Sequence, residues 1–261
     1  MFRIAALTST ALALSLSAAA AAPAIGLIED RTLVIFDTES LSVTGMIDVD
    51  GVERLHGIDM RPTDSSLVAV TSDNRLVSID PATGATTKLS VMDAPLPETD
   101  AQVVVDFNPA DDHLRLMTGT TNHRVNVQTG EVIVDGGLVF EAGDPNETAT
   151  PQVVAAAHTN SIGQPAETAM FDIDMALGAL LQQTLPNDGI LVTIGKLGIA
   201  APGDVAAMDI QTTEAMENTA FMVTNNVLYI VDLESGAATE RGVIQDVEAP
   251  IRDLAVMAAA E

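Results

Sequence analysis

The chain has 261 residues, of which 47% are hydrophobic, and a formal net charge of −26 at pH 7. This acidity disfavours nucleic acid as a partner, because the protein surface and the phosphate backbone repel each other. The chain contains no cysteine, which excludes both a disulfide framework and lipid attachment at a cysteine.

The first 22 residues have the composition of a secretory signal peptide. One positive charge at Arg3 precedes the apolar stretch 4–18, and an alanine run follows at 18–22. Small residues after such a stretch provide a cleavage site. We predict a signal peptide over residues 1–22 and a mature protein that is periplasmic or secreted, without stable membrane insertion. The alternative is an uncleaved anchor, for which the hydroxyl residues and alanines make a weak span.

Short runs of β-favouring residues alternate with turn-forming clusters through the rest of the chain. The pattern is complete in residues 55–90, where Pro62 ends the first run because it has no amide donor. A turn is predicted at 80–84, which combines Asp80, a proline and Gly84. The four predicted strands of this unit are 56–61, 67–71, 76–79 and 85–90.

The same order of elements recurs along the chain with variations. Residues 25–49 supply three strands, and 251–257 supplies one strand with nothing after it. The stretch 137–151 is predicted to be a polar loop. The next unit, 103–136, opens with the run VVDFNP at 104–109 and continues with predicted strands 113–117, 124–127 and 132–134. Strands 153–159, 169–174, 180–184 and 190–197 follow, with a last unit over 205–244.

The turns before the last strand of each unit give the period of the repeat. They fall at Leu41, Gly84, Gly130, Gly189 and Gly236, which are 43 to 59 residues apart. Propeller blades repeat about every 40–50 residues. We therefore predict one all-β domain over 25–257, a five-bladed β-propeller whose C-terminal strand completes the N-terminal blade and leaves few sheet edges exposed. A six-bladed propeller and a β-sandwich are the alternatives.

Several motifs occur in an order that resembles one family. They are GIDMRP, LVSIDPATGATT, VDFNPADDHLRL, AGDPNETATPQVVAAAHTN, PNDGILVTIGKLG and IRDLAV. Together they resemble the exported bacterial family catalogued as domain of unknown function 4394 (DUF4394), from about residue 25 to 257. The resemblance implies export and a propeller-like domain, and it implies no catalytic residues. A weaker resemblance, at 223–232, is to the repeats of surface-layer propellers, which are usually binding or adhesive modules.

An acidic residue stands at a similar place in four of the predicted inner strands, and His158 stands nearest in the fifth. The four are Asp59, Asp106, Asp209 and Asp253. Facing a central channel, these side chains could bind a hard divalent cation such as calcium through oxygen ligands. Alternatively, each Asp accepts backbone hydrogen bonds and ties the blades together.

Two further side chains belong to this candidate ligand- or cation-binding set. Arg61 and Asn108 each follow an Asp by two residues and therefore lie on the same strand face. Arg61 could neutralise part of the acidic group. No cofactor is expected apart from a possible divalent cation.

The sequence lacks the usual signs of covalent catalysis and nucleotide binding. It has no cysteine, no serine in a nucleophile elbow and no glycine-rich phosphate loop between a strand and a helix. We predict an exported, monomeric, non-catalytic binding or scaffold protein whose partner is a protein, a polymer or a small ligand. The alternative is a metal-dependent hydrolase or lactonase that acts at the channel with His158 as the base.

Overall fold

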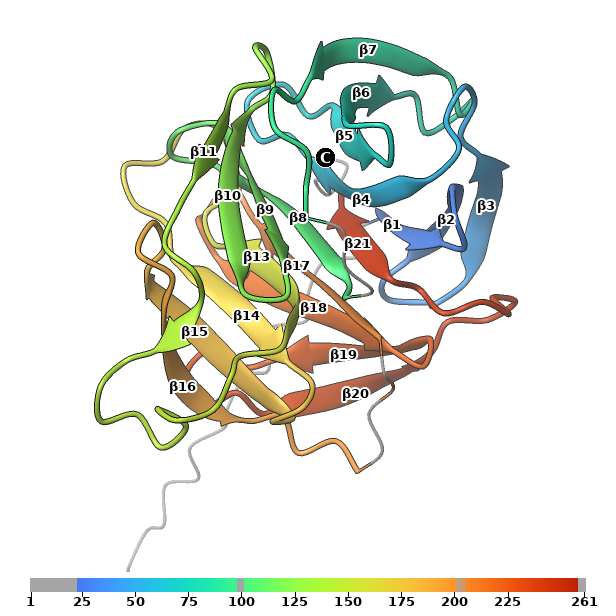
Figure 1. Cartoon of the computed structure of the whole chain (residues 1–261). Helices are drawn as coiled ribbons and strands as arrows, with labels where there is room; N and C mark the ends of the chain where they lie inside the picture. The colour runs from blue at the N-terminus through green and yellow to red at the C-terminus, as the bar shows by residue number, and fades with distance from the viewer. Residues whose placement is uncertain (1–22, 98–100, 201–202, 204, 258–261) are drawn as a thin grey trace, which may run out of the picture.

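The computed structural model describes residues 23–97, 101–200, 203 and 205–257. Within these residues every regular element is a β-strand, and the strands form five small sheets around a common axis (Figure 1). The predicted five-bladed β-propeller is therefore confirmed, and the six-bladed ring and the sandwich are wrong. The region for which a signal peptide is predicted, 1–22, lies outside the described residues.

The first three blades each contain four antiparallel strands, which follow one another from the axis outward. Blade 1 consists of β21 (Asp253–Val256), β1 (Pro23–Ile28), β2 (Thr32–Asp37) and β3 (Val43–Asp48). Blade 2 consists of β4 (Leu55–Met60), β5 (Leu67–Thr71), β6 (Arg75–Ile79) and β7 (Thr86–Val91). Blade 3 consists of β8 (Val103–Asn108), β9 (His113–Thr118), β10 (Thr121–Asn126) and β11 (Val132–Val134).

Blade 4 has five strands and blade 5 has four. Blade 4 consists of β13 (Val153–His158), β14 (Met170–Asp174), β15 (Ala179–Leu185), β16 (Ile190–Lys196) and β12 (Val139–Phe140). Blade 5 consists of β17 (Ala206–Thr212), β18 (Asn218–Thr224), β19 (Val227–Val231) and β20 (Ala238–Val243). No described helix is long and apolar enough to cross a bilayer.

Two sequence predictions of local structure need correction. The stretch 137–151 is not entirely a loop, because β12 pairs in parallel with β16, placing Val139 opposite Ile190. Strand β10 begins at Thr121 rather than at 124, because a tight turn at Gly119, with φ of +57°, lets Thr121 pair directly with Thr118.

The ring closes where the two ends of the described chain meet. Strand β21 pairs antiparallel with β1, with Ala24 opposite Val256 and Leu27 opposite Asp253. On its other sides β21 contacts the inner strands β4 and β17 of the neighbouring blades. The C-terminal strand therefore completes the N-terminal blade, as the sequence predicts.

The apolar core lies between the blades. Each of the five pairs of neighbouring blades shares one buried cluster. Between blades 1 and 2, for example, Ile25 and Leu33 pack with Ile58 and Leu67. Fully burying such a side chain contributes about 1.5–3 kcal/mol. Each blade face therefore needs its neighbour, and leaving the ring open would expose two apolar faces.

The repeated turns share one local structure. Asp80 Oδ1 accepts the backbone N–H of Ala82 at 2.9 Å, and Asp232 Oδ1 accepts that of Ser235 at 2.8 Å. Gly84 and Gly236 then take φ of +75° and +79°. This left-handed conformation favours glycine, although Leu41 adopts it in blade 1 with φ of +59°.

Candidate functional site

A pocket of about 460 Å³ lies where the inner strands end. Strands β4, β8, β13, β17 and β21 lie side by side around the axis, and the pocket is lined by residues at or just after their C-terminal ends. The wall combines apolar side chains such as Met60 and Ile162 with polar ones such as Gln211 and Thr213. Its size and mixed lining are typical of small-molecule sites, which are about 300–1,000 Å³.

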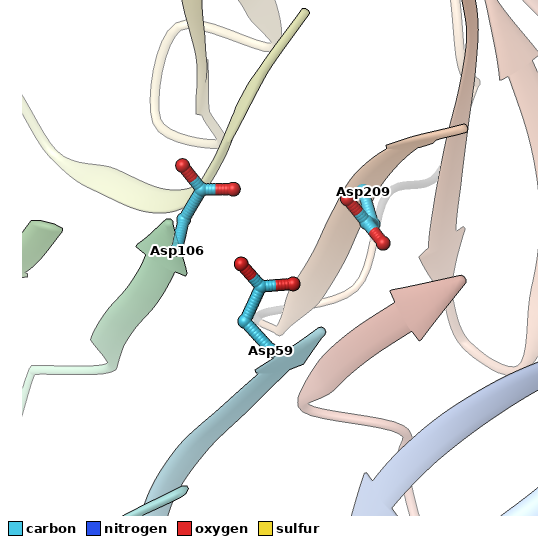
Figure 2. Close-up of side chains that lie close together, drawn as sticks. All are labelled: Asp59, Asp106 and Asp209. Atoms are coloured by element: carbon cyan, nitrogen blue, oxygen red, sulfur yellow. The ribbon is translucent and has the colours of Figure 1, made fainter. Parts of the chain in front are cut away.

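Three aspartates from different blades converge in this pocket. Asp59 of β4, Asp106 of β8 and Asp209 of β17 all line it, and one oxygen of each lies within 4.8 Å of the other two (Figure 2). All three residues are buried. The fold therefore brings together, from blades far apart in the chain, residues that the sequence pattern had indicated.

The inner strands explain why aspartate occupies these positions. An inner strand has no neighbouring strand on its axial side, so some backbone N–H groups there lack a partner. Asp59 accepts one from Met60 in its own strand and one from Phe107 in the next blade, both at 2.6 Å. The carboxylate of Asp59 thus satisfies two backbone donors and joins blade 2 to blade 3.

The same arrangement recurs at two other aspartates. Asp209 accepts the N–H groups of Ile210 at 2.6 Å and Val256 at 2.5 Å. Asp253 accepts those of Leu254 at 3.1 Å and Ile58 at 2.7 Å. Asp253 belongs neither to the pocket lining nor to the group of three carboxylates. Asp59, Asp209 and Asp253 therefore make the backbone hydrogen bonds that are expected if these aspartates tie neighbouring blades together.

Asp106 differs from the other three because it is bonded to a side chain. Its Oδ2 pairs with Nδ1 of His158, the inner-strand residue of blade 4. No hydrogen bond to Oδ1 of Asp106 is found among the described residues, and Nε2 of His158 is also buried without a partner there. Asp106 therefore keeps one uncommitted carboxylate oxygen in a residue that lines the pocket.

The environment disfavours the charged form of two pocket carboxyls. Burial raises the pKa of Asp59 well above its usual value, and repulsion from Asp209 and Asp106 raises it further. Burial raises the pKa of Asp209 to about 7, with Asp106 adding to the effect and the N–H groups of Val256 and Ile210 opposing it. A positive charge in this pocket would favour the charged forms of Asp59 and Asp209 and so lower both pKa values.

Arg61 and Asn108 are not directed at the aspartate group. Arg61 lines the pocket, but its guanidinium binds Asp112, with Nε 2.9 Å from Oδ1, and also Asp64 at 3.2 Å. It therefore does not neutralise the central carboxylates. Asn108 uses Oδ1 to accept the N–H of Ala110 at 2.9 Å and stabilises the turn after β8.

The opposite end of the inner strands is bridged by a residue that the sequence pattern did not indicate. Gln102 stands immediately before β8, and its Nε2 donates to the carbonyl of Ala206 at 2.7 Å and to that of Arg252 at 2.5 Å. These carbonyls belong to blade 5 and to the segment leading into blade 1. Gln102 thus links three blades at the end away from the pocket.

A buried ionic group between blades 3 and 4 was also missed. Arg115 of β9 has a fully buried side chain, and its NH1 lies 2.7 Å from Asp135 and 2.9 Å from Asn122. Asp172 of β14 is fully buried, and neither of its oxygens has a hydrogen-bond partner among the described residues. Arg115 lies between two leucines in β9, and Asp172 lies between Phe171 and Ile173 in β14, so each is a charged residue with apolar neighbours in the sequence.

Chemically, the three pocket carboxylates can receive positive charge. Oxygen atoms within 4.8 Å of one another can bridge a divalent cation that binds oxygen at about 2.3–2.6 Å. They can equally accept hydrogen bonds from a charged nitrogen. Most of their capacity is already used, because both oxygens of Asp59 and Asp209 accept backbone N–H groups.

The fold and site define a five-bladed β-propeller with a pocket at the C-terminal ends of its inner strands. Residues 32–255 match the family described as "Domain of unknown function (DUF4394)", and the chain belongs to that family. The family resemblance found in the motifs is thereby confirmed. No curated protein matches the sequence significantly.

Three solved structures from Bacteroides are similar to the chain. A protein of unknown function from Bacteroides caccae has 10% identity and a TM-score of 0.43, over 92% of this chain and 99% of that one. An auxiliary nutrient binding protein from Bacteroides ovatus has 13% identity and a TM-score of 0.43, over 82% of this chain. Another from Bacteroides thetaiotaomicron has 10% identity and a TM-score of 0.46, over 83% of this chain. The chain spans 57% and 58% of those two proteins.

Proposed function

We propose that the protein is an exported, non-catalytic binding propeller that takes a small-molecule ligand in the pocket at the C-terminal ends of its inner strands. The observation that carries this proposal is the pocket itself, about 460 Å³ in volume, lined by residues from several blades. Export is inferred from the composition of residues 1–22.

The polar groups of the pocket support binding better than covalent catalysis. Ser161 lines the pocket, but its hydroxyl donates to the carbonyl of Ile210 at 2.8 Å. The imidazole of His158 contacts Asp106 rather than a hydroxyl nucleophile. A nucleophile must lie within hydrogen-bond reach of its base, and these contacts supply no such pair.

Small-molecule binding is tested by screening a library of sugars, amino acids, amines and organic acids by saturation-transfer NMR against three forms of the mature protein. The forms are the wild type, Ile162→Trp and Val134→Trp. Ile162 is 38% exposed and lines the pocket, whereas Val134 is 70% exposed on the outer strand of blade 3. We expect at least one compound to bind the wild type and Val134→Trp but not Ile162→Trp. A library with no such compound would contradict the proposal.

A hydrolase is distinguished by a separate assay. Ester and lactone hydrolysis is measured with added calcium or manganese for the wild type and Asp106→Asn. We expect no turnover above that of the buffer. Metal-dependent turnover that is lost in Asp106→Asn would replace the binding proposal with the hydrolase.

A further inference from the structure

We propose that this pocket binds the primary ammonium group of an aliphatic amine, held among the carboxylates of Asp59, Asp106 and Asp209, with the carbon chain against the apolar wall. The inference rests on the proposed binding function and specifies the chemical class of its ligand.

The spacing of the carboxylates is compatible with the geometry of an ammonium group. A primary ammonium has three N–H donors in a tetrahedral arrangement. With charge-assisted N···O distances of about 2.8 Å, its three acceptors would lie about 4.6 Å from one another. One oxygen from each of the three aspartates lies within 4.8 Å of the others, a limit that leaves room for the O···O separations of a bound ammonium.

Asp106 gives the site an acceptor that the protein does not use. This residue is only 4% exposed and lines the pocket, yet its Oδ1 accepts no hydrogen bond from the described residues. Figure 2 shows the side chains of Asp59, Asp106 and Asp209 lying close together, each at the end of a different strand. The bonded oxygens of Asp59 and Asp209 each keep a second lone pair for a ligand N–H.

The same inventory favours an ammonium over a hard metal ion. Calcium takes six to eight oxygen ligands, whereas these three residues have six carboxylate oxygens in all, and five of them already bond to protein groups. The pocket of about 460 Å³ is also much larger than a metal ion needs. An ammonium needs three acceptors, and its carbon chain can occupy the remaining volume.

The charges around the pocket favour a cationic group. Arg61 is the only lysine or arginine in the described lining, and Asp112 and Asp64 already compensate its charge. The net charge of −26 further attracts cations toward the protein. An ammonium would also offset the mutual repulsion that contributes to the raised pKa of Asp59.

The pocket wall suits the carbon chain of the amine. Met60, Pro62, Phe107, Ile162, Val256 and Met257 all contribute to the lining. Removing apolar surface from water contributes about 25 cal/mol per Å². An unbranched amine of several carbons therefore satisfies both the acidic and the apolar parts of the pocket, whereas an alcohol satisfies only the apolar part.

The test is a calorimetric titration of the mature protein with hexylamine, hexanol, hexanoate and calcium chloride, in 150 mM salt to screen the acidic surface. Hydrogen bonds to charged groups contribute about 1.5–3 kcal/mol, so hexylamine should bind at least about tenfold more tightly than hexanol. Hexanoate should not bind. Asp106→Asn should weaken hexylamine binding at least about tenfold. Asp30→Asn, at an exposed carboxyl outside the pocket lining, should leave it unchanged.

Several results would overturn the inference. These are equal affinities for hexylamine and hexanol, unchanged hexylamine binding by Asp106→Asn, or tight calcium binding that hexylamine does not displace. If Asp106→Asn fails to fold, Ile162→Trp serves instead and must abolish hexylamine binding, and retained binding in that variant counts against the site. If hexylamine fails but a neutral compound binds in an Ile162→Trp-sensitive way, only the amine inference falls. If no compound does so, the binding function falls as well.

Discussion

Asp253, in the last strand of the chain, accepts a hydrogen bond at 2.7 Å from the backbone N–H of Ile58, which lies 195 residues earlier. The bond joins blade 1 to blade 2 on the axial side of the inner strands. Gly57, next to Ile58, leaves the room this requires, because a Cβ there would collide with Asp253 and Val105. The closure of the ring therefore depends on a buried carboxylate and on the absence of one side chain.

Asp253→Ala should destabilise the protein, because the N–H groups of Ile58 and Leu254 lose their acceptor. A buried unsatisfied donor costs about 1–3 kcal/mol. The loss should be smaller at pH 8 than at pH 5, since burial raises the pKa of Asp253 and the variant also removes the cost of charging it. Urea unfolding measures both values. Asp30→Ala, at a side chain that is 71% exposed, serves as the control and should change stability by less than about 0.5 kcal/mol. Equal effects of the two variants would contradict this role of Asp253.

Asp172→Asn should stabilise the protein at pH 8. Burial raises the pKa of Asp172 well above its usual value of 3.8, with Arg115 opposing and Asp106 adding to the shift. The folded state therefore holds this proton more tightly than the unfolded state. Its contribution to stability is fully present below the unfolded pKa and is lost as the pH rises toward the folded pKa. Asparagine is neutral throughout, so the gain in the free energy of unfolding should grow from pH 5 to pH 8.

The measurement for Asp172→Asn is urea unfolding of wild type and variant at pH 5, 6.5 and 8. Asp80→Asn is a suitable comparison, because hydrogen bonds from Thr83 and Ala82 lower the pKa of Asp80, the opposite direction. A gain for Asp172→Asn that is constant with pH, or a loss at pH 8, would show that this carboxyl is not held in its neutral form.

Gly130→Ala should cost more than Gly143→Ala, although both glycines have positive φ, +78° and +88°. A Cβ at Gly130 would collide with the backbone carbonyl of Val91 in the neighbouring blade, whereas one at Gly143 meets nothing within 4 Å. Backbone strain alone costs about 1–2 kcal/mol. We expect thermal unfolding to show that loss for Gly143→Ala and a clearly larger one for Gly130→Ala. Equal losses would mean that the turn does not pack against the neighbouring blade.

Gln102→Glu should destabilise the protein more than Gln102→Ala does. Alanine removes two hydrogen bonds, to the carbonyls of Ala206 and Arg252, which contribute about 0.5–1.5 kcal/mol each. Glutamate also brings carboxylate oxygens against those two carbonyls, where no donor remains. Urea unfolding at pH 7.5 ranks the variants. A glutamate variant as stable as the wild type would contradict the bridging role of Gln102.

Much of the fold could be predicted from the sequence because short runs of β-favouring residues alternate with turn-forming clusters. These turns contain residues such as glycine and proline, which have distinctive backbone preferences. Strands β2, β5 and β11 have the predicted bounds. The turn glycines indicated the number of blades, because each takes positive φ at the same place in its unit. The two-residue strand β12 was missed because its pairing with β16 depends on a segment about 50 residues away.

Three of the predicted aspartates, Asp59, Asp106 and Asp209, lie together, but the contacts of the predicted residues could not be read from the sequence. An aspartate marks four of the five inner strands, but the bonds that Asp59 and Asp209 accept from a neighbouring blade depend on how the blades dock. Arg61 illustrates the limit: its partner Asp112 is 51 residues away, and nothing in the local pattern indicates it. Asp172 could have been noticed as a charge within the apolar run MFDID of β14.

A crystal structure of the mature protein soaked with hexylamine tests the central claim most directly, because that claim places a binding site over three inner-strand carboxylates. We predict the amine nitrogen within hydrogen-bond distance, about 2.7–3.2 Å, of Oδ1 of Asp106, with the carbon chain beside Met60 and Ile162. A pocket that contains only solvent under saturating hexylamine, or an amine bound solely at exposed surface carboxylates, would contradict the account.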